Sequence, residues 1–293
     1  MIRDCDDYNL IEKQKLPLKQ KIKMTNERII DWYSHWEGQV YISFSGGKDS
    51  TVLFHLIKNL YPDVPTVFIN TGFEYPEIIK FVRSFENIIW LNPKIKFINV
   101  IKKYGYPIIS KEQSQYLQQY RHAKSEKTKN TRLNGNSYGR GKISEKWKYL
   151  IDAPFEISDK CCTILKKNPA INYEKETNRK PYIGILAEES SKRVQNYNLY
   201  GCNAFNAKRP TSKPLSFWLE NDIWKYIKKE NITCSEIYKK GYTRTGCAGC
   251  MYGLHLNNPN KIEQLKISHP KMYDYLFKNL NYKTVIDHYL KIK

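Results

Sequence analysis

One six-residue run constrains the fold of this chain more than any other feature. Residues 45–50, Ser-Gly-Gly-Lys-Asp-Ser, follow a short β-rich segment at 39–44 and precede a helical pattern at 51–58. Paired glycines let the backbone turn sharply, so that successive N–H groups can converge on an anion. The helix that follows presents its positive dipole end to the same anion. A strand, a glycine loop and a helix in this order predict a phosphate-binding loop.

The side chains of this loop supply the chemistry that a bound phosphate needs. Serine hydroxyls can donate hydrogen bonds, a lysine can supply a positive charge, and an aspartate can hold Mg²⁺ or cap the helix. Only two glycines precede the lysine, so the run differs from the GxxxxGK[ST] loop of the common NTPases. We predict Lys48 and Asp49 as catalytic residues. The predicted nucleotide-binding residues of the loop are Ser45, Gly46, Gly47, Lys48, Asp49 and Ser50.

Helix and strand patterns alternate on both sides of the loop. A helix is predicted at 21–37, where apolar and aromatic residues recur at helical spacing, and another at 75–85. Further strands are predicted at 64–70, 95–101 and 182–186. This alternation predicts an α/β fold with a doubly wound, mostly parallel sheet that helices cover on both faces.

The loop and three later segments resemble a known family. SFSGGKDS is similar to the PP-loop of the adenine-nucleotide α-hydrolase superfamily, and residues 68–77 resemble the segment that lines the adenosine pocket in its phosphoadenosine phosphosulfate (PAPS) reductase branch. Asn70 stands where that branch has Asp. Residues 188–193 and 213–226 resemble two further segments of the branch. The resemblance implies a Rossmann-like fold and an adenine nucleotide as ligand, either ATP or an adenylyl-sulfate-type nucleotide. It also implies the site residues Thr71, Gly72, Glu77 and, as a catalytic residue that meets the nucleotide or substrate anion, Arg193.

Four of the seven cysteines form two pairs. Cys247 and Cys250 make a CxxC turn, and the adjacent Cys161 and Cys162 precede it by 85 positions. Four thiolates can hold zinc or a [4Fe–4S] cluster, and adjacent cysteines suit a cluster because its separate irons offer separate coordination points. The alternative is that these cysteines are ordinary small apolar residues. The arrangement resembles the cluster signature of bacterial adenylyl-sulfate reductases, which implies a [4Fe–4S] cluster on all four.

The charge of the chain is strongly positive and partly concentrated. Lys and Arg number 49 against 29 Asp and Glu, a formal net charge of +20. Residues 121–148 hold nine basic and two acidic side chains with no apolar periodicity, which predicts a mobile basic loop. A positive surface favours a polyanion such as nucleic acid. The alternative is that the lysines merely solvate the surface.

The organisation predicted for the chain has three parts. They are an N-terminal helical segment at 1–38, a PP-loop domain at 39–255 with the basic insertion at 121–148, and a C-terminal helical segment at 256–293. No apolar run approaches the roughly 20 residues that span a bilayer, and the N-terminal residues lack the apolar centre of a secretory signal. We therefore expect a cytoplasmic protein with reduced thiols and no membrane partner.

Three functions remain open from the sequence. Sulfonucleotide reductases carry a nucleophilic cysteine near the C-terminus, and no cysteine follows Cys250 here. We therefore place first an ATP-dependent sulfur transfer by adenylation of an oxygen, with nucleic acid as the acceptor and a sulfur-donor protein such as a cysteine desulfurase as a partner. Second is an adenylyl-sulfate or PAPS reductase that releases sulfite, and third is a non-catalytic redox sensor. The oligomeric state stays open, with a homodimer as one option.

Overall fold

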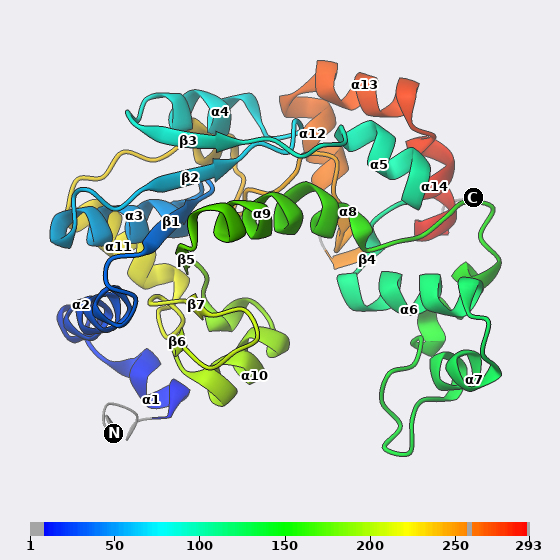
Figure 1. Ribbon diagram of the computed structural model, residues 1–293. Coiled ribbons are helices and arrows are strands. Elements are labelled where there is room, and N and C mark those ends of the chain that lie inside the picture. The colour runs from blue at the N-terminus through cyan, green and yellow to red at the C-terminus, as the bar shows by residue number, and fades with distance from the viewer. Residues whose placement is uncertain (1–8, 257–259, 292–293) are drawn as a thin grey trace. The chain divides into compact units, whose positions relative to one another are not determined.

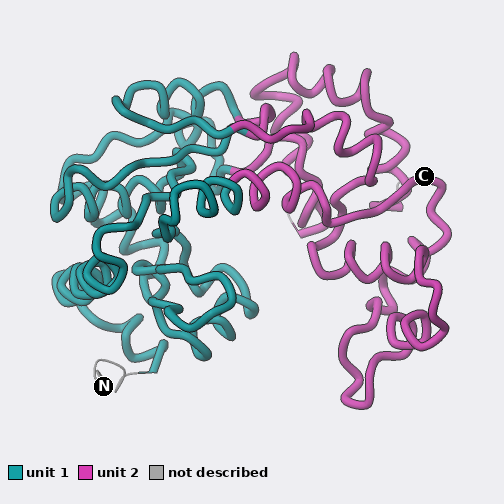
Figure 2. Tube along the Cα trace, viewed as in Figure 1, with its two compact units in different colours: residues 1–70, 75–91, 170–245 teal, residues 71–74, 92–169, 246–293 magenta. Residues whose placement is uncertain are grey.

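The computed structural model describes residues 9–256 and 260–291, so Cys5 lies outside the described residues. The chain divides into two compact units (Figure 2). Unit 1 comprises residues 1–70, 75–91 and 170–245, and unit 2 comprises residues 71–74, 92–169 and 246–293. Within the described ranges, no helix is both long enough and apolar enough to cross a bilayer.

Unit 1 is built on a six-stranded sheet (Figure 1). Its strand order is β3-β2-β1-β5-β7-β6, and each neighbouring pair is parallel except β6 with β7. The mostly parallel α/β sheet predicted from the sequence is therefore confirmed. The strands are β1 (Val40–Phe44), β2 (Thr66–Ile69), β3 (Ile88–Leu91), β5 (Lys180–Ile183), β6 (Asn203–Ala204) and β7 (Thr211–Ser212).

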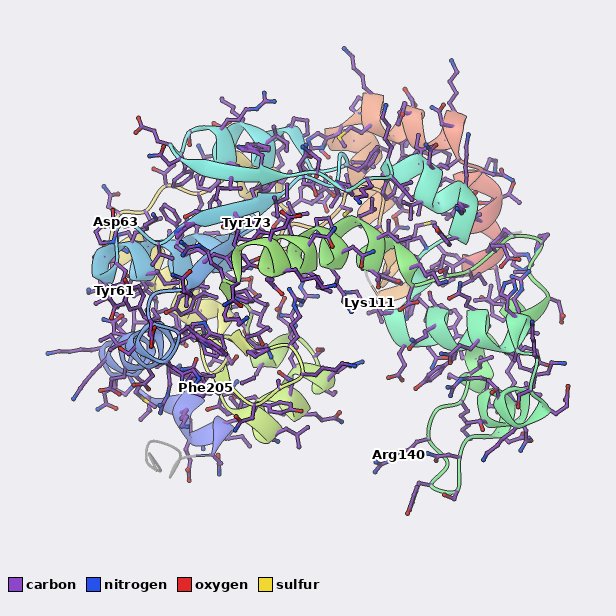
Figure 3. The ribbon with its side chains drawn as sticks, viewed as in Figure 1. Tyr61, Asp63, Lys111, Arg140, Tyr173 and Phe205 are labelled. Carbon is purple, nitrogen blue, oxygen red and sulfur yellow. The ribbon has the colours of Figure 1, made fainter. Side chains whose placement is uncertain are left out.

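Helices pack on both faces of this sheet. Along β1, Val40 and Ile42 are buried in one apolar core with residues of α2, α3 and α11. Tyr41 between them packs on Tyr173 of α9, a residue labelled in Figure 3. Alternate side chains of a strand point to opposite faces, so the sheet is covered on both. The helices that lie wholly in unit 1 are α1 (Leu10–Lys15), α2 (Leu18–His35), α3 (Lys48–Leu60), α4 (Pro76–Arg83), α10 (Ser191–Tyr200) and α11 (Glu220–Lys229).

Unit 2 is mainly helical, and its described residues include a short parallel pair of strands, β4 (Ile108–Ile109) and β8 (Met251–Tyr252). A continuous helical stretch consisting of α8 (Lys160–Cys162), a π-helical turn at Thr163–Lys167 and α9 (Asn168–Thr177) crosses the boundary between the units. The other helices are α5 (Phe97–Tyr104), α6 (Lys111–His122), α7 (Glu126–Asn134), α12 (Lys261–Ser268), α13 (Pro270–Asn279) and α14 (Tyr282–Leu290).

The structure corrects two expectations, both in unit 2. The strand expected at 95–101 is helix α5, because Phe97, Val100 and Ile101 have the i, i+3, i+4 spacing of a buried helix face. The third strand of the sheet is instead β3. The segment at 121–148 is not a continuous loop, because it contains the end of α6, all of α7 and the beginning of a 3₁₀ helix at Glu145–Asp152.

Candidate functional site

The glycine loop joins β1 to α3 in unit 1, as predicted. Its own polar groups hold it in a closed turn: the Ser45 N–H donates to Ser50 Oγ at 3.1 Å, and the Gly47 N–H donates to Ser45 Oγ at 3.3 Å. The Ser50 hydroxyl in turn donates to the Gly47 carbonyl at 2.9 Å. Gly47 is the residue that precedes the first turn of α3, so the loop delivers its amides to a helix N-terminus, where an anion is favoured.

Both loop glycines are required by their surroundings. Gly46 has φ +71°, which L side chains rarely adopt, and a Cβ there would lie 2.9 Å from the Val82 side chain. A Cβ on Gly47 would lie 2.5 Å from Thr245 Oγ1 and 3.4 Å from the Tyr238 hydroxyl. The backbone at Gly47 is therefore approached closely by the segment 238–245, which covers the loop.

Lys48 is buried, and both its ammonium and its backbone N–H have interaction partners. Its ammonium donates to the Thr243 carbonyl at 3.0 Å, and it lies 3.1 Å from Glu220 Oε1 and 3.8 Å from Asp49 Oδ1. Its backbone N–H donates to the Tyr238 hydroxyl at 2.6 Å. An incoming phosphate can take over the roles of the Tyr238 oxygen and the Glu220 carboxylate, since both are oxygen acceptors for the same lysine.

The buried carboxyl of Asp49 has a raised pKa. Burial raises the pKa of its carboxyl above the ordinary value, and the nearby Glu220 raises this pKa further, while Lys48 lowers it. Among the described residues, the buried Asp49 Oδ1 has no hydrogen-bond partner. A buried carboxylate oxygen without a hydrogen bond is costly, so this atom is a natural ligand for a cation.

Lys48 and Asp49 line one cavity of about 450 Å³ in unit 1. This volume lies in the range of roughly 300–1,000 Å³ that is typical of small-molecule sites. Its charged walls include Glu189, to which Arg244 donates at 2.7 Å. The residues that line the cavity are Lys48, Asp49, Leu186, Glu188, Glu189, Leu219, Glu220, Asn221, Thr243 and Arg244.

The other predicted nucleotide residues lie in three different places. Arg193 pairs with Glu189 and donates to the Leu186 carbonyl at 3.3 Å. It therefore contacts two residues that line the cavity but does not line the cavity itself. Burial lowers the pKa of the Arg193 guanidinium, and the Asp49 carboxylate opposes that shift. Glu77 is paired with Lys240 at 2.5 Å and does not line the cavity. Thr71 and Gly72 belong to unit 2.

The four predicted metal ligands all belong to unit 2. Cys161 and Cys162 occupy the single turn α8, and Cys247 and Cys250 form a turn closed by the Cys250 N–H, which donates to the Cys247 carbonyl at 3.0 Å. Thr71 Oγ1 lies 3.4 Å from Cys247 Sγ. The predicted nucleotide residue Thr71 is therefore a neighbour of the cysteines.

The four thiols influence one another electrostatically. A hydrogen bond with Cys162 raises the pKa of Cys161 most, and burial and the charges of Cys162, Cys250 and Cys247 add to the shift. The same hydrogen bond lowers the pKa of Cys162, and nearby lysines lower it further. Lys166 responds to the thiolates, chiefly Cys247, with a raised pKa. The cysteine cluster is thus a centre of potential negative charge with cations beside it.

The CxxC turn is fixed by tight packing. A Cβ on Gly249 would lie 3.0 Å from the Phe97 ring and 3.1 Å from the Leu276 side chain. The Tyr282 hydroxyl donates to the Gly249 carbonyl at 2.6 Å, and the Lys261 ammonium donates to the Cys247 carbonyl at 2.7 Å. Helices α5, α12, α13 and α14 therefore all contribute a contact that positions this turn.

The four cysteines are candidate ligands for a metal cofactor. In the part of the chain that is described, no three His, Cys, Asp or Glu side chains are grouped to hold one metal ion. A structural zinc site places four ligands tetrahedrally around one ion, whereas a [4Fe–4S] cluster distributes four thiolates over separate irons. Four thiols with the ammonium groups of Lys166 and Lys261 nearby also suit the net negative charge of a thiolate-bound cluster.

Several residues of these sites are absent from the sequence-based prediction. Tyr238, Thr243 and Glu220 contact Lys48 across 172–195 positions of sequence, and no local pattern marks them as partners of the loop. Lys261 lies in an ordinary amphipathic helix. Of these residues, Glu220 alone falls in a segment that resembles the PAPS reductase branch, so the sequence could have indicated a role in the site for this residue.

Comparisons with known proteins identify the family to which this chain is similar. A family model described as the phosphoadenosine phosphosulfate reductase domain matches residues 39–252. The uncharacterized protein MJ0066 of Methanocaldococcus jannaschii is 27% identical over 93% of this chain, which spans 51% of that relative's length. An adenosine 5'-phosphosulfate reductase of Lysinibacillus sphaericus is 23% identical over 76% of this chain and 78% of its own. The crystal structure of a PAPS reductase from Candida auris aligns over 84% of this chain and 97% of its own, with 16% identity and a TM-score of 0.46.

Proposed function

This chain belongs to the phosphoadenosine phosphosulfate reductase family, and from that premise we propose that it is an ATP-dependent sulfur-transfer enzyme. Unit 1 binds ATP and activates an acceptor oxygen by adenylation. Unit 2 holds a [4Fe–4S] cluster, and the acceptor is a nucleic acid. The chain spans about half the length of its M. jannaschii relatives, so the proposal concerns the reaction carried by these 293 residues.

The observation that carries the proposal is the buried Asp49 Oδ1 with no hydrogen-bond partner in the described residues, beside Lys48 in the 450 Å³ cavity. When ATP reacts at its α-phosphorus, the leaving pyrophosphate carries several negative charges, and Mg²⁺ bound by a carboxylate neutralises them. An adenylyl sulfate has no pyrophosphate and makes no such demand. A carboxylate poised for a cation therefore favours ATP.

The residues of unit 1 then have distinct roles. The acceptor oxygen attacks the α-phosphorus, the bond from phosphorus to the bridging oxygen breaks, and pyrophosphate leaves with that electron pair. Lys48 exchanges Glu220 for a phosphate oxygen and stabilises the charge that develops there. The amides of Gly47 and Lys48 bind a phosphate oxygen at the N-terminus of α3. Asp49 would hold the Mg²⁺.

The second step replaces the activated oxygen with sulfur. Hydrosulfide attacks the carbon that bears the adenylate, the C–S bond forms as the C–O bond breaks, and AMP leaves with the oxygen and the electron pair. A sulfur-donor protein such as a cysteine desulfurase supplies this sulfur as a persulfide, which a thiol reductant releases. Cys161, Cys162, Cys247 and Cys250 would ligate all four irons of the cluster, which would order the segments that carry these cysteines when present.

A second candidate, a sulfonucleotide reductase, is favoured by a different observation. The L. sphaericus relative that matches 76% of this chain is named as such a reductase. In that reaction a thiolate attacks the sulfur of adenylyl sulfate, AMP leaves, and a thiol reductant then releases sulfite. Sulfite release in the presence of thioredoxin distinguishes this function from adenylation.

Exchange of radiolabelled pyrophosphate into ATP tests the proposal. We expect Mg²⁺-dependent exchange by the wild-type protein, stimulated by nucleic acid, and a loss of about 100-fold or more in Lys48→Met because a cation at the reacting phosphate is removed. Lys225→Met is the matched control, since Lys225 is an exposed lysine of α11 that does not line the cavity. Exchange that is absent from the wild type, or equal in the two variants, would contradict the proposed adenylation.

A further inference from the structure

A second and larger hollow is lined by residues of unit 2. It has a volume of about 1,260 Å³, above the range of roughly 300–1,000 Å³ that is usual for small-molecule sites. We call it the unit 2 groove. Its residues come from α5, α6, α7, α8 and the segments between them: Lys103, Tyr104, Gln115, Gln118, Gln119, His122, Ala123, Lys124, Ser125, Thr128, Arg132, Glu156, Asp159, Lys160, Thr163 and Ile164. A hollow of this size suits a segment of polymer.

The groove combines positive charge with a tyrosine ring. Lys103 and Lys160 place their ammonium groups 5.4 and 5.5 Å from the centre of the Tyr104 ring, so two cations gather at one aromatic side chain. Lys124 adds a third exposed ammonium. Unit 2 as a whole has 24 Lys and Arg against 10 Asp and Glu, a formal charge of +14 out of the total of +20. The ligand is therefore anionic.

Uncharged amides lie between these cations. Gln115 and Gln118 are three positions apart on α6, so they share one side of the helix. Neither side chain has a hydrogen-bond partner among the residues that the structure describes. A primary amide offers both donors and an acceptor, which match the edges of nucleobases. An acidic peptide would need the cations but not these amides.

The groove has a rigid wall where α6 and α7 lie side by side (Figure 1). Arg132 of α7 donates to Gln119 Oε1 of α6 at 2.7 Å, and its guanidinium lies 4.5 Å from the centre of the Tyr116 ring. Figure 3 labels Lys111 at the beginning of α6 and Arg140 beyond the end of α7, two further cations of unit 2 that do not line the groove. Gln115 and Gln118 are thus presented from a braced helix, whereas Lys103 and Lys160 lie on α5 and α8 and Lys124 lies in the connection between α6 and α7.

The groove shares one helix with the cysteine pair. Lys160, Thr163 and Ile164 line it at the i, i+3, i+4 spacing of one helix side, whereas Cys161 and Cys162 occupy the positions between them and do not line it. A ligand in the groove therefore contacts the segment that carries two cysteines without contacting their sulfurs. In this arrangement the groove could hold the acceptor next to the cysteine pair without covering the sulfurs.

We propose that the unit 2 groove binds a single-stranded segment of nucleic acid, with Lys103, Lys124 and Lys160 on its phosphates and Gln115 and Gln118 on its unpaired bases. Base edges must be unpaired to meet amides in a groove of this kind, and single strands are recognised by such combinations of cations, rings and hydrogen bonds. The inference rests on the proposed function, because it names where the acceptor of that reaction is held.

Fluorescence anisotropy with a labelled single strand of about 12 nucleotides tests this inference. The probes are RNA and DNA of the same mixed sequence, and the DNA duplex. We expect the wild type to bind single strands more tightly than the duplex. In K103Q/K124Q/K160Q, binding should weaken at least tenfold, and the slope of log K against log salt should flatten by about 2, because each lost phosphate contact removes roughly 0.7.

The matched control is K266Q/K271Q/K278Q, which removes three exposed lysines from α12 and α13 of the same unit. Equal affinities and salt slopes in the two triple variants would overturn the proposal. So would equal competition by a polyglutamate of matched charge. Q115A/Q118A provides a second variant that keeps every charge: it should weaken binding and reduce discrimination between sequences with the salt slope unchanged, and unaltered binding would contradict the role of the amides.

The two proposals fail in different ways. A wild-type protein that exchanges pyrophosphate with ATP but binds no oligonucleotide overturns the groove assignment and leaves the adenylation chemistry intact. A protein that binds single strands through the groove but performs no exchange supports the groove and contradicts adenylation. The RNA and DNA arms identify which sugar the acceptor carries.

Discussion

Unit 1 has 163 residues and a formal charge of +6, whereas unit 2 has 130 residues and a charge of +14. Unit 1 is a sheet with an apolar core on either face, and its polar site is formed where β1 meets α3. Unit 2 has one two-stranded pair, four cysteines and most of the excess cations. In the proposed function, this difference corresponds to a division of labour in which unit 1 binds the nucleotide and unit 2 holds the cluster and a large anionic acceptor.

The largest effect is expected from the removal of a proposed cluster ligand. Cys250→Ser should lose most of its iron and acid-labile sulfide and lower the thermal stability of unit 2, because ligand binding stabilises the fold that forms the site. Iron and sulfide assays after anaerobic purification measure the loss, and ATP binding by equilibrium dialysis should stay unchanged. Cys234→Ser, a half-buried cysteine of unit 1, is the control. Full iron content in Cys250→Ser would show that the cluster assignment is wrong.

The next largest effect comes from the loop itself. Gly47→Ala adds a Cβ 2.5 Å from Thr245 Oγ1, so the segment that covers the loop must move. We expect ATP affinity to fall about tenfold, which corresponds to roughly 1.4 kcal/mol, with the iron content preserved. Gly246→Ala is the control, since the nearest atom to its Cβ is Lys261 Nζ at 3.8 Å. Calorimetric titration with ATP compares the two variants, and equal affinities would contradict the close approach.

Asp49→Asn should change the stability and the activity of unit 1 in opposite directions. Burial raises the pKa of Asp49, so its ionised form is disfavoured in the folded protein and costs stability at pH values above that raised pKa. The neutral amide should therefore raise the melting temperature by about 2 °C while Mg²⁺-dependent exchange is lost. In the wild type, protonation of this carboxyl should abolish Mg²⁺ stimulation as pH falls, at a higher pH than for an ordinary aspartate.

A thermal scan and a pH profile of exchange check both parts of this prediction. Asp63→Asn is the control, because Asp63 is an exposed carboxylate of unit 1 that does not line the cavity. A melting temperature that falls in Asp49→Asn would contradict the cost of ionising this buried carboxyl. Mg²⁺ stimulation that persists in this variant would contradict the proposal that Asp49 holds the cation.

The smallest effect should come from Glu220→Gln. Glu220 holds the Lys48 ammonium at 3.1 Å but is itself half-exposed, and ion pairs in contact with water contribute little. Releasing Lys48 from this competitor should tighten ATP binding about threefold. Glu230→Gln at the end of the same helix should leave the affinity unchanged. Weaker binding in Glu220→Gln would mean that Glu220 supports the nucleotide instead of competing with it.

The two units also differ in how well their helices and strands could be predicted from the sequence. Unit 1 follows simple periodicities: the apolar run at β1, the glycines and the amphipathic α3 succeed one another between Val40 and Leu60, so the place of the loop between a strand and a helix was predictable. The segment at 95–101 was misread because Phe97, Val100 and Ile101 satisfy a helix while the intervening residues also suit a strand. Short apolar runs leave this ambiguity to tertiary packing.

Helix α7 illustrates a second reason for failure. It has no buried residue, so it lacks the apolar periodicity by which helices are predicted. Its stability comes from a Glu126–Lys129 pair at 2.9 Å, from Gly135 with φ +95° at its end, and from the contact of Arg132 with α6. The Tyr238 and Thr243 contacts of Lys48 were missed for a related reason, because the fold alone brings together residues 190 or more positions apart.

Analysis of the products from two substrates tests the central claim most directly. The anaerobically purified protein is given Mg²⁺ and ATP with a single-stranded acceptor and a sulfur donor in one reaction, and adenylyl sulfate with thioredoxin in the other. The account predicts pyrophosphate and AMP from the first reaction and no sulfite from the second. Sulfite from adenylyl sulfate, with no pyrophosphate from ATP, would contradict it and assign the chain to sulfonucleotide reduction.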